Sequence, residues 1–231
     1  MRGAVSVESI LAEMKSKGDP RAVAGMAKFG ISPEGTLGLS IPVLRRMARS
    51  IGTNHALALG LWETRVHEAR ILASLIDDPR KVTESQMESW VADLDSWDVC
   101  DGCCGNLFDK TPFAYRKAIE WSRSEEEFVK RAGFVLMAEL VVHDKAAPDD
   151  AFLRFFGAIE RGSTDPRNFV RKAVNWALRQ IGKRNLNLNR EALQLARKIS
   201  AIENPSSKWV ASDAIRELKS EAVRKRLRRS S

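Results

Sequence analysis

The sequence of 231 residues has no long apolar run, and this limits what it encodes. No stretch approaches the roughly eighteen consecutive apolar residues that a membrane-spanning helix needs. The first residues, Met1–Lys17, alternate polar and apolar types and show no apolar core or cleavage site of a signal peptide. We therefore expect a cytoplasmic protein without a membrane partner, and no obligate protein partner is evident.

Cysteine and histidine are scarce, with three of each. Cys100, Cys103 and Cys104 form an odd, tightly spaced set, which is a poor basis for disulfides. Cys100 and Cys103 have a spacing found in metal sites, but a closed zinc site needs four ligands and the histidines show no paired spacing. We expect no metal and interpret the cysteines as small apolar residues packed inside a helix.

Acidic residues are outnumbered, 30 against 38 basic, and the net charge is +8. This balance favours an anionic partner, nucleic acid first and a membrane surface second. Residues 220–231 contain five basic residues and one acidic residue, and 165–184 contain six and one. By contrast, Val82–Asp109 has seven acidic residues and no lysine or arginine. Acidic residues at helix starts are an ordinary explanation of that acidic stretch, because the helix dipole favours them there.

No segment alternates apolar and polar residues for long enough to predict a strand. Apolar residues recur at helical spacing instead, interrupted at short intervals by proline and glycine. Helices are predicted over 6–17, 20–29, 54–62, 66–76, 84–94, 97–108, 112–122, 125–142, 149–159, 167–183, 190–202 and 206–217, and one more begins after Ser40 as its N-cap. Residues 30–39, with Pro33, Gly35 and Gly38, are expected to connect two helices.

Helices of this length joined by short turns, with a pair spacing of about 35–45 residues, predict an all-α solenoid of HEAT-like repeats. Such a solenoid has a concave face, which recurring basic residues would line. We expect one repeat domain over residues 1–219 and a flexible basic tail over 220–231. The tail would either attract phosphates or simply aid solubility.

One candidate site lies in Ser96-Trp97-Asp98-Val99-Cys100-Asp101. With Ser96 as N-cap, Trp97 and Asp101 are four residues apart and share a helix face. An indole beside a carboxylate can receive a cation through cation–π attraction and charge. A tryptophan at a helix start is also typical of an ordinary packed core.

A second candidate surface lies on the predicted helix 167–183. Lys172, Trp176 and Arg179 share one face, and Arg171 and Lys183 lie beside it. Tryptophan among basic residues is typical of contacts to phosphates and nucleobases, although a core tryptophan with solvated charges has the same pattern. Arg131, at the start of an apolar helix, is by default a structural or snorkelling side chain.

Together these motifs resemble one family, the bacterial DNA alkylation repair enzymes of the AlkD type. The resemblance rests on Trp97-Asp98-Val99-Cys100-Asp101, Arg131-Ala-Gly133 and Lys172-Ala-Val-Asn-Trp176-Ala-Leu-Arg179, in that order. The phrases Ser40-Ile-Pro-Val-Leu-Arg45 and Glu68-Ala-Arg-Ile-Leu-Ala73 support it. It covers roughly residues 20–220, so the basic tail lies outside it.

The resemblance implies HEAT-like repeats that cradle duplex DNA and excise cationic lesions of the 7-methylguanine and 3-methyladenine type. It implies that Asp101 is the catalytic aspartate, that Trp97 and Trp176 are at the lesion, and that Arg131 is the active-site arginine. It also implies contact with the lesion's deoxyribose without a deep base-flipping pocket, unlike most base-modifying enzymes. The expected DNA-binding residues are Arg45, Arg171, Lys172, Arg179 and Lys183. An N-terminal aromatic contact is harder to match, and Phe29 is the one candidate.

The residue types suit this chemistry. A cationic base already leaves well, and a fixed carboxylate stabilises the positive charge that develops on the sugar. No metal or organic cofactor is called for. We expect the acidic stretch Val82–Asp109 to make the catalytic strip negative while basic residues elsewhere hold phosphates. Two alternatives remain: a non-catalytic HEAT-like protein that binds damaged or branched DNA, and a HEAT-type scaffold for another protein.

Overall fold

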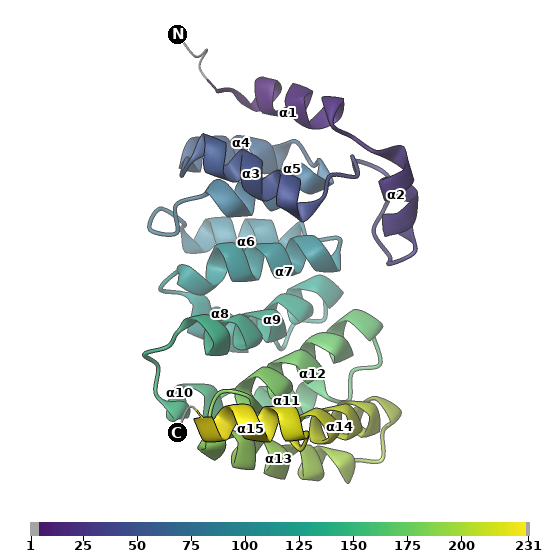
Figure 1. Ribbon diagram of the computed structural model, residues 1–231, viewed down its shortest axis with the longest axis vertical. Helices are drawn as coiled ribbons and strands as arrows, with labels where there is room; N and C mark the ends of the chain where they lie inside the picture. Colours follow the sequence, from purple (N-terminus) through teal and green to yellow (C-terminus); the bar gives the residue numbers. More distant parts are fainter. Residues whose placement is uncertain (1–4, 230–231) are drawn as a thin grey trace. The chain divides into compact units, whose positions relative to one another are not determined.

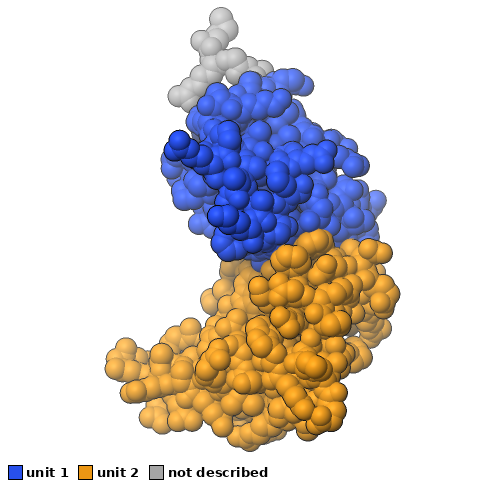
Figure 2. All heavy atoms as spheres, turned by 90° about the vertical axis from the view of Figure 1, so that its right-hand side faces the viewer, with its two compact units in different colours: residues 1–111 blue, residues 112–231 orange. Residues whose placement is uncertain are grey.

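The computed structural model describes residues 5–229, and in that part of the chain every regular element is a helix (Figure 1). The chain divides into two compact units, residues 1–111 and 112–231 (Figure 2). One repeat domain over residues 1–219 stays a prediction of the sequence beside this division. Each unit has its own core and is described by itself.

Unit 1 is built around one helix that is buried along most of its length. Its elements are α1 (Val7–Ser16), α2 (Pro20–Ala27), α3 (Ile41–Ile51), α4 (His55–Glu63), α5 (His67–Ile76), α6 (Glu84–Ala92), α7 (Trp97–Asn106) and the short 3-10 helix η1 (Phe108–Lys110). Helix α5 packs against α3, α4 and α7, and nine of its ten residues are buried. A helix that is buried nearly all round belongs to the centre of its unit.

The connector between α2 and α3 is fixed by the Glu68 carboxylate. This fully buried side chain accepts hydrogen bonds from the backbone N–H groups of Leu37, Gly38 and Leu39 at 2.9, 2.6 and 3.1 Å. Gly38 has φ +82°, and a Cβ there would lie 2.3 Å from the Asp19 carbonyl oxygen. The connector thus needs a glycine at this position and a carboxylate at position 68.

Unit 2 is organised around two long helices. Its elements are α8 (Ala114–Trp121), α9 (Glu127–His143), α10 (Asp149–Leu153), α11 (Phe156–Gly162), α12 (Asn168–Gly182), α13 (Leu186–Ser200), α14 (Pro205–Leu218) and α15 (Glu221–Arg229). Helix α9 packs against α8 and α12, and α12 also contacts α11, α13 and α14. Gly133 allows α8 and α9 to approach closely, because a Cβ there would lie 2.5 Å from the Ser122 backbone nitrogen.

The helices follow the sequence prediction with three differences. Residues 149–159, predicted as one helix, form α10 and α11 with a break at Arg154 and Phe155. Helix α13 begins at Leu186, four residues earlier than predicted, with Asn185 capping the N–H of Leu188. The basic segment expected to be a flexible tail forms α15, whose Val223 and Leu227 are buried, while residues 230–231 lie outside the described part.

Among residues 5–229, no helix combines the length and apolar character required to cross a bilayer.

Candidate active site

Helix α7 presents Trp97 and Asp101 one turn apart, as the sequence predicts. Both side chains are partly exposed, whereas Val99 and Cys100 between them are buried. Ser96 is the N-cap residue by backbone conformation, but its side chain makes no capping hydrogen bond. Residues four apart on a helix lie on the same face, so an indole and a carboxylate share one accessible surface.

The Trp97 indole is fixed by a contact from the N-terminal part of unit 1. Its Nε1–H donates to the Phe29 carbonyl oxygen at 3.1 Å, across 68 positions of the chain. The Phe29 side chain itself is 68% exposed. The backbone of the segment after α2 thus orients the Trp97 indole, and this segment continues into the connector that Glu68 holds.

The other carboxylate at the start of α7, Asp98, has a structural role. Its Oδ2 lies 2.9 Å from His67 Nε2, and its Oδ1 accepts the Val99 N–H. Burial alone would lower the pKa of His67, but the hydrogen bond and charge of Asp98 outweigh burial and raise that pKa above the ordinary 6.5. Burial opposes ionisation of Asp98 too, yet His67 lowers the pKa of Asp98 below the ordinary 3.8. The ion pair joins the first turns of α5 and α7.

Other carboxylates of Val82–Asp109 also serve unit 1. Asp93 accepts the Trp62 Nε1–H at 3.1 Å, and Asp95 lies 3.4 Å from the Arg70 guanidinium. The expectation that this whole stretch forms a negative catalytic strip is therefore too broad, because Asp93, Asp95 and Asp98 are bonded to neighbouring helices. The interpretation of the cysteines is confirmed: Cys100, Cys103 and Cys104 are buried in α7, and none of them forms a disulfide.

In unit 2, Arg131 is a buried link between two helices. It is 6% exposed, and its Nη1–H donates to the Phe169 carbonyl oxygen in the first turn of α12 at 2.7 Å. This hydrogen bond agrees with a structural role for Arg131. By holding the start of α12, Arg131 positions the surface that follows on that helix.

The N-terminal half of α12 carries an aromatic and basic surface. Lys172 is exposed, Arg171 and Trp176 are partly exposed, and the Arg171 guanidinium carbon lies 5.0 Å from the ring centre of Trp209 on α14. Trp209 is 38% exposed. Arginine stacked on indole offers both charge and a flat apolar surface to a nucleic acid.

The C-terminal half of α12 is different, because its basic residues are paired. Arg179 is hydrogen-bonded to Glu217 and lies 3.7 Å from Asp213, and Lys183 Nζ lies 2.7 Å from Glu217. Burial would raise the pKa of Glu217, but Lys183 and Arg179 lower it. These two predicted DNA contacts are therefore partly neutralised by α14. Arg45, on α3 of unit 1, is exposed.

Residues 10–218 match the model of the DNA alkylation repair enzyme family. The chain belongs to this family.

Two solved structures resemble this chain in fold to different extents. A solved structure described as "a new family of proteins related to the HEAT-like repeat DNA glycosylases with affinity for branched DNA structures" has a TM-score of 0.82 and 19% identity, and the match covers 96% of both chains. This confirms the predicted all-α, HEAT-like fold. A designed armadillo repeat protein is more distant, with a TM-score of 0.37 and 12% identity over 76% of this chain and 92% of that one.

A curated relative, Uncharacterized protein Lin0241 of Listeria innocua serovar 6a, is 30% identical over 105 residues. The match covers 44% of this chain and 47% of the relative, so it spans about half the length of the curated relative.

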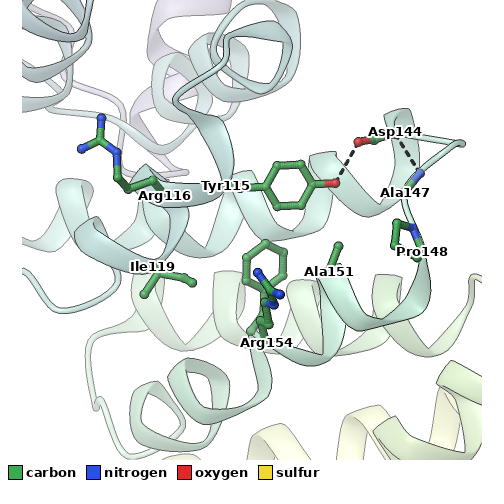
Figure 3. Close-up of a pocket in the computed structure, with 9 residues that line it drawn as sticks. Tyr115, Arg116, Ile119, Asp144, Ala147, Pro148, Ala151 and Arg154 are labelled. Carbon is green, nitrogen blue, oxygen red and sulfur yellow. Dashed lines mark hydrogen bonds between the residues drawn. The ribbon is translucent and has the colours of Figure 1, made fainter.

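Unit 2 also contains a pocket that none of the predicted site residues lines (Figure 3). Its volume is about 510 Å³, and its walls come from α8, α10 and the loop after α9. The Tyr115 hydroxyl donates a hydrogen bond to Asp144 at 2.9 Å. The pKa of the phenol is raised, first by burial and second by the hydrogen bond and charge of Asp144. Asp144 follows the last residue of α9, whereas Arg131 is in its second turn. The pocket is therefore at the other end of α9 from Arg131.

Sequence reasoning missed several partners of the site residues. The contacts of Trp97 with Phe29, of Asp98 with His67 and of Arg171 with Trp209 span between 31 and 68 positions. No periodicity reveals such pairs. The available signal was residue type alone, since a buried histidine or tryptophan nitrogen needs a hydrogen-bond partner.

Proposed function

We propose that the protein is a DNA glycosylase that hydrolyses the N-glycosidic bond of cationic N-alkylated purines, of the 7-methylguanine and 3-methyladenine type, in duplex DNA. One observation carries the proposal. Of the two carboxylates at the start of α7, Asp98 is bonded to His67, while Asp101 shares a partly exposed face with Trp97. A carboxylate beside an indole on an accessible face is suited to a developing cation.

In the proposed reaction, the bond from C1′ to the alkylated base breaks and the base leaves with the bonding electron pair as a neutral purine. The sugar becomes positively charged, in an oxocarbenium-like state. Asp101 stabilises this charge and positions the water that adds to C1′, whose proton is released. The leaving base is already cationic, so no general acid is needed, and no deep base-flipping pocket is invoked.

The other residues position and hold the DNA. Trp97 contacts the lesion from unit 1, and its indole is oriented by the Phe29 carbonyl. Trp176 contacts it from α12, and Arg131 is a positioning residue that fixes the start of that helix. Arg45, Arg171 and Lys172 bind phosphates directly, whereas Arg179 and Lys183 do so in competition with Glu217. No protein partner is invoked.

Replacing Asp101 with asparagine tests the enzyme assignment. We expect Asp101→Asn to release 7-methylguanine from duplex DNA at least about a hundredfold more slowly, because a neutral amide cannot stabilise the sugar cation. Binding to the same duplex should change little. Free base is measured by chromatography in single-turnover reactions.

Asp95→Asn is the matched control. It removes a carboxylate from the same acidic stretch, and the Asp95 side chain is 70% exposed. It should excise at the wild-type rate. Wild-type excision by Asp101→Asn, with Asp95→Asn equally active, would remove Asp101 from the mechanism.

A second candidate function is binding of branched DNA without bond cleavage. The observation in its favour is the structural similarity to the protein described as having affinity for branched DNA, at a TM-score of 0.82. This function predicts tighter binding to a four-way junction than to alkylated duplex and no free base from either. Release of 7-methylguanine by the wild-type protein would exclude it as the sole activity.

A further inference from the structure

Helix α15 carries a dense group of basic side chains on a fixed backbone. Arg224, Lys225, Arg228 and Arg229 are all exposed, and no carboxylate of residues 5–229 pairs with any of them. This helix follows the part of the chain that matches the family model, which ends at residue 218. Neither the family assignment nor the candidate active site accounts for it.

The helix is anchored on unit 2. Val223 and Leu227, one turn apart, are 8% and 2% exposed. The Ser220 side chain accepts the Val223 N–H, and the Arg226 guanidinium donates to the Lys183 carbonyl oxygen at 2.5 Å. An ordered helix holds its charges in place, so binding an anion costs less conformational entropy than ordering a free tail would.

The spacing of the charges suits a polyanion. Arg224 and Arg228 form one row along the helix and Lys225 and Arg229 another, with neighbours in a row about 5–6 Å apart. Duplex DNA places a phosphate every 3.4 Å or so of axis on each strand, so several phosphates lie within reach of such a surface. A membrane surface fits less well, because interfacial helices insert an apolar face and the apolar face of α15 is already buried in the protein.

The anchor also relates α15 to α12. Arg226 contacts residue 183, just after the last residue of α12, whereas Lys172 lies near the beginning of that helix. Eleven residues of helix span about 16 Å, which corresponds to roughly five base steps of duplex. Within unit 2, α15 is thus well removed from the aromatic and basic surface of Arg171 and Lys172.

We infer that α15 is a second phosphate-binding element, which grips the backbone of duplex DNA away from the lesion-contacting surface. The inference rests on the DNA-binding part of the proposed function and does not require the glycosylase chemistry. Its contribution is independent of sequence and lesion, because phosphate contacts position a protein on DNA and carry no base information.

The test is the salt dependence of binding to unmodified duplex. Each phosphate contact contributes about 0.9 to the slope of log K against log salt. We expect the triple variant Arg224→Gln, Lys225→Gln, Arg228→Gln to lower the magnitude of this slope by about two to three, with an unchanged circular dichroism spectrum. Titrations between about 50 and 200 mM salt, monitored by fluorescence anisotropy, give the slope.

The control is a second triple variant, Lys145→Gln, Arg154→Gln, Arg197→Gln. It removes the same number of positive charges from exposed, unpaired positions elsewhere in unit 2. It should lower the slope by less than about one. Equal slopes for the two triple variants, or a wild-type protein whose DNA binding is insensitive to salt, would overturn the inference. The inference would also be overturned if the α15 triple variant lost binding to vesicles of anionic lipid while the salt slope of its binding to duplex DNA was unchanged. If the wild-type protein released no alkylated base, but the α15 triple variant still showed the reduced salt slope, the proposed enzyme activity would be refuted and this inference would stand.

Discussion

His67 and Asp98 show how a buried polar side chain can give two neighbouring carboxylates different surroundings. Asp98 and Asp101 are both acidic and three residues apart on α7, and residue type alone does not separate them. The imidazole of His67 takes Asp98 as its partner at 2.9 Å and so fixes the first turn of the helix. Asp101 lies on the same helix face as Trp97, and its proposed role follows from that position.

The same pair predicts a pH dependence of stability. The pKa of His67 is raised, so its stabilisation is fully present below about pH 6.5 and is lost as the pH rises through the folded-state value. The pKa of Asp98 is lowered, so its contribution is present above about pH 3.8 and is lost as the pH falls through its folded-state value. The pair should therefore stabilise most between these two limits.

His67→Gln measures this contribution. We expect the variant to lose about 1–3 kcal/mol of unfolding free energy near pH 6, because a charge-assisted hydrogen bond is removed from a buried site. The difference from wild type should shrink steadily toward pH 9. Denaturant unfolding across this range, followed by tryptophan fluorescence, gives both values. A difference that stays constant from pH 6 to pH 9 would show that folding does not raise the pKa of His67.

At the scale of helices and connectors, the segment between α2 and α3 determines where Phe29 and hence the Trp97 indole lie. Gly38→Ala should destabilise the protein by more than about 2 kcal/mol, because φ +82° is strained for alanine and the new Cβ would meet the Asp19 carbonyl. Base excision should fall as well, since Trp97 loses its fixed partner. Thermal unfolding and excision rates measure the two effects.

Gly25→Ala is the control for this substitution. Gly25 lies in α2, and a Cβ there would meet no atom within 4 Å. Alanine should leave stability unchanged or raise it slightly, because it is the better helix former. If both variants had wild-type stability, the connector would not be held as tightly as the Glu68 contacts indicate.

Local signals explain which elements could be predicted. Ser40 before Ile41-Pro42 marks the start of α3, since proline suits the first helical turn. The start of α13 was missed because its cap, Asn185, stands among other asparagines, which are poor helix formers. The break between α10 and α11 contains neither proline nor glycine, so packing of Phe152 and Phe155 into the core decides it. Propensity carries no information about such tertiary choices.

At the scale of the whole molecule, the net charge of +8 indicated an anionic partner, but not which basic residues would be available. Arg179 and Lys183 look equivalent to Arg171 and Lys172 in the sequence. In the structure α14 pairs the first two with Glu217, whereas Arg171 stacks on Trp209 and Lys172 is exposed. Sequence therefore predicts the total charge and the segments that carry it, while long-range contacts decide which basic side chains are paired with carboxylates.

The proposed function also makes a prediction about cooperation between the two units. Trp97 belongs to unit 1 and Trp176 to unit 2. If both act in the same chemical step, their effects on excision should be strongly non-additive, as for other residues that act as a unit. We expect Trp97→Ala and Trp176→Ala each to slow excision of 7-methylguanine by about tenfold, in line with cation–π energies. The double variant should then be much less than a hundredfold slower.

Trp97→Ala combined with Trp209→Ala is the matched comparison, since Trp209 is a second partly exposed tryptophan of unit 2 that contacts Arg171. Trp209 contacts Arg171, which binds phosphate in the proposal, so under saturating enzyme the effect of Trp209→Ala should simply add to that of Trp97→Ala. Single-turnover rates for the six proteins complete both cycles. If the free-energy changes of Trp97→Ala and Trp176→Ala add up to that of the double variant within about 0.5 kcal/mol, the two indoles do not serve one step. The catalytic assignment would then rest on α7 alone.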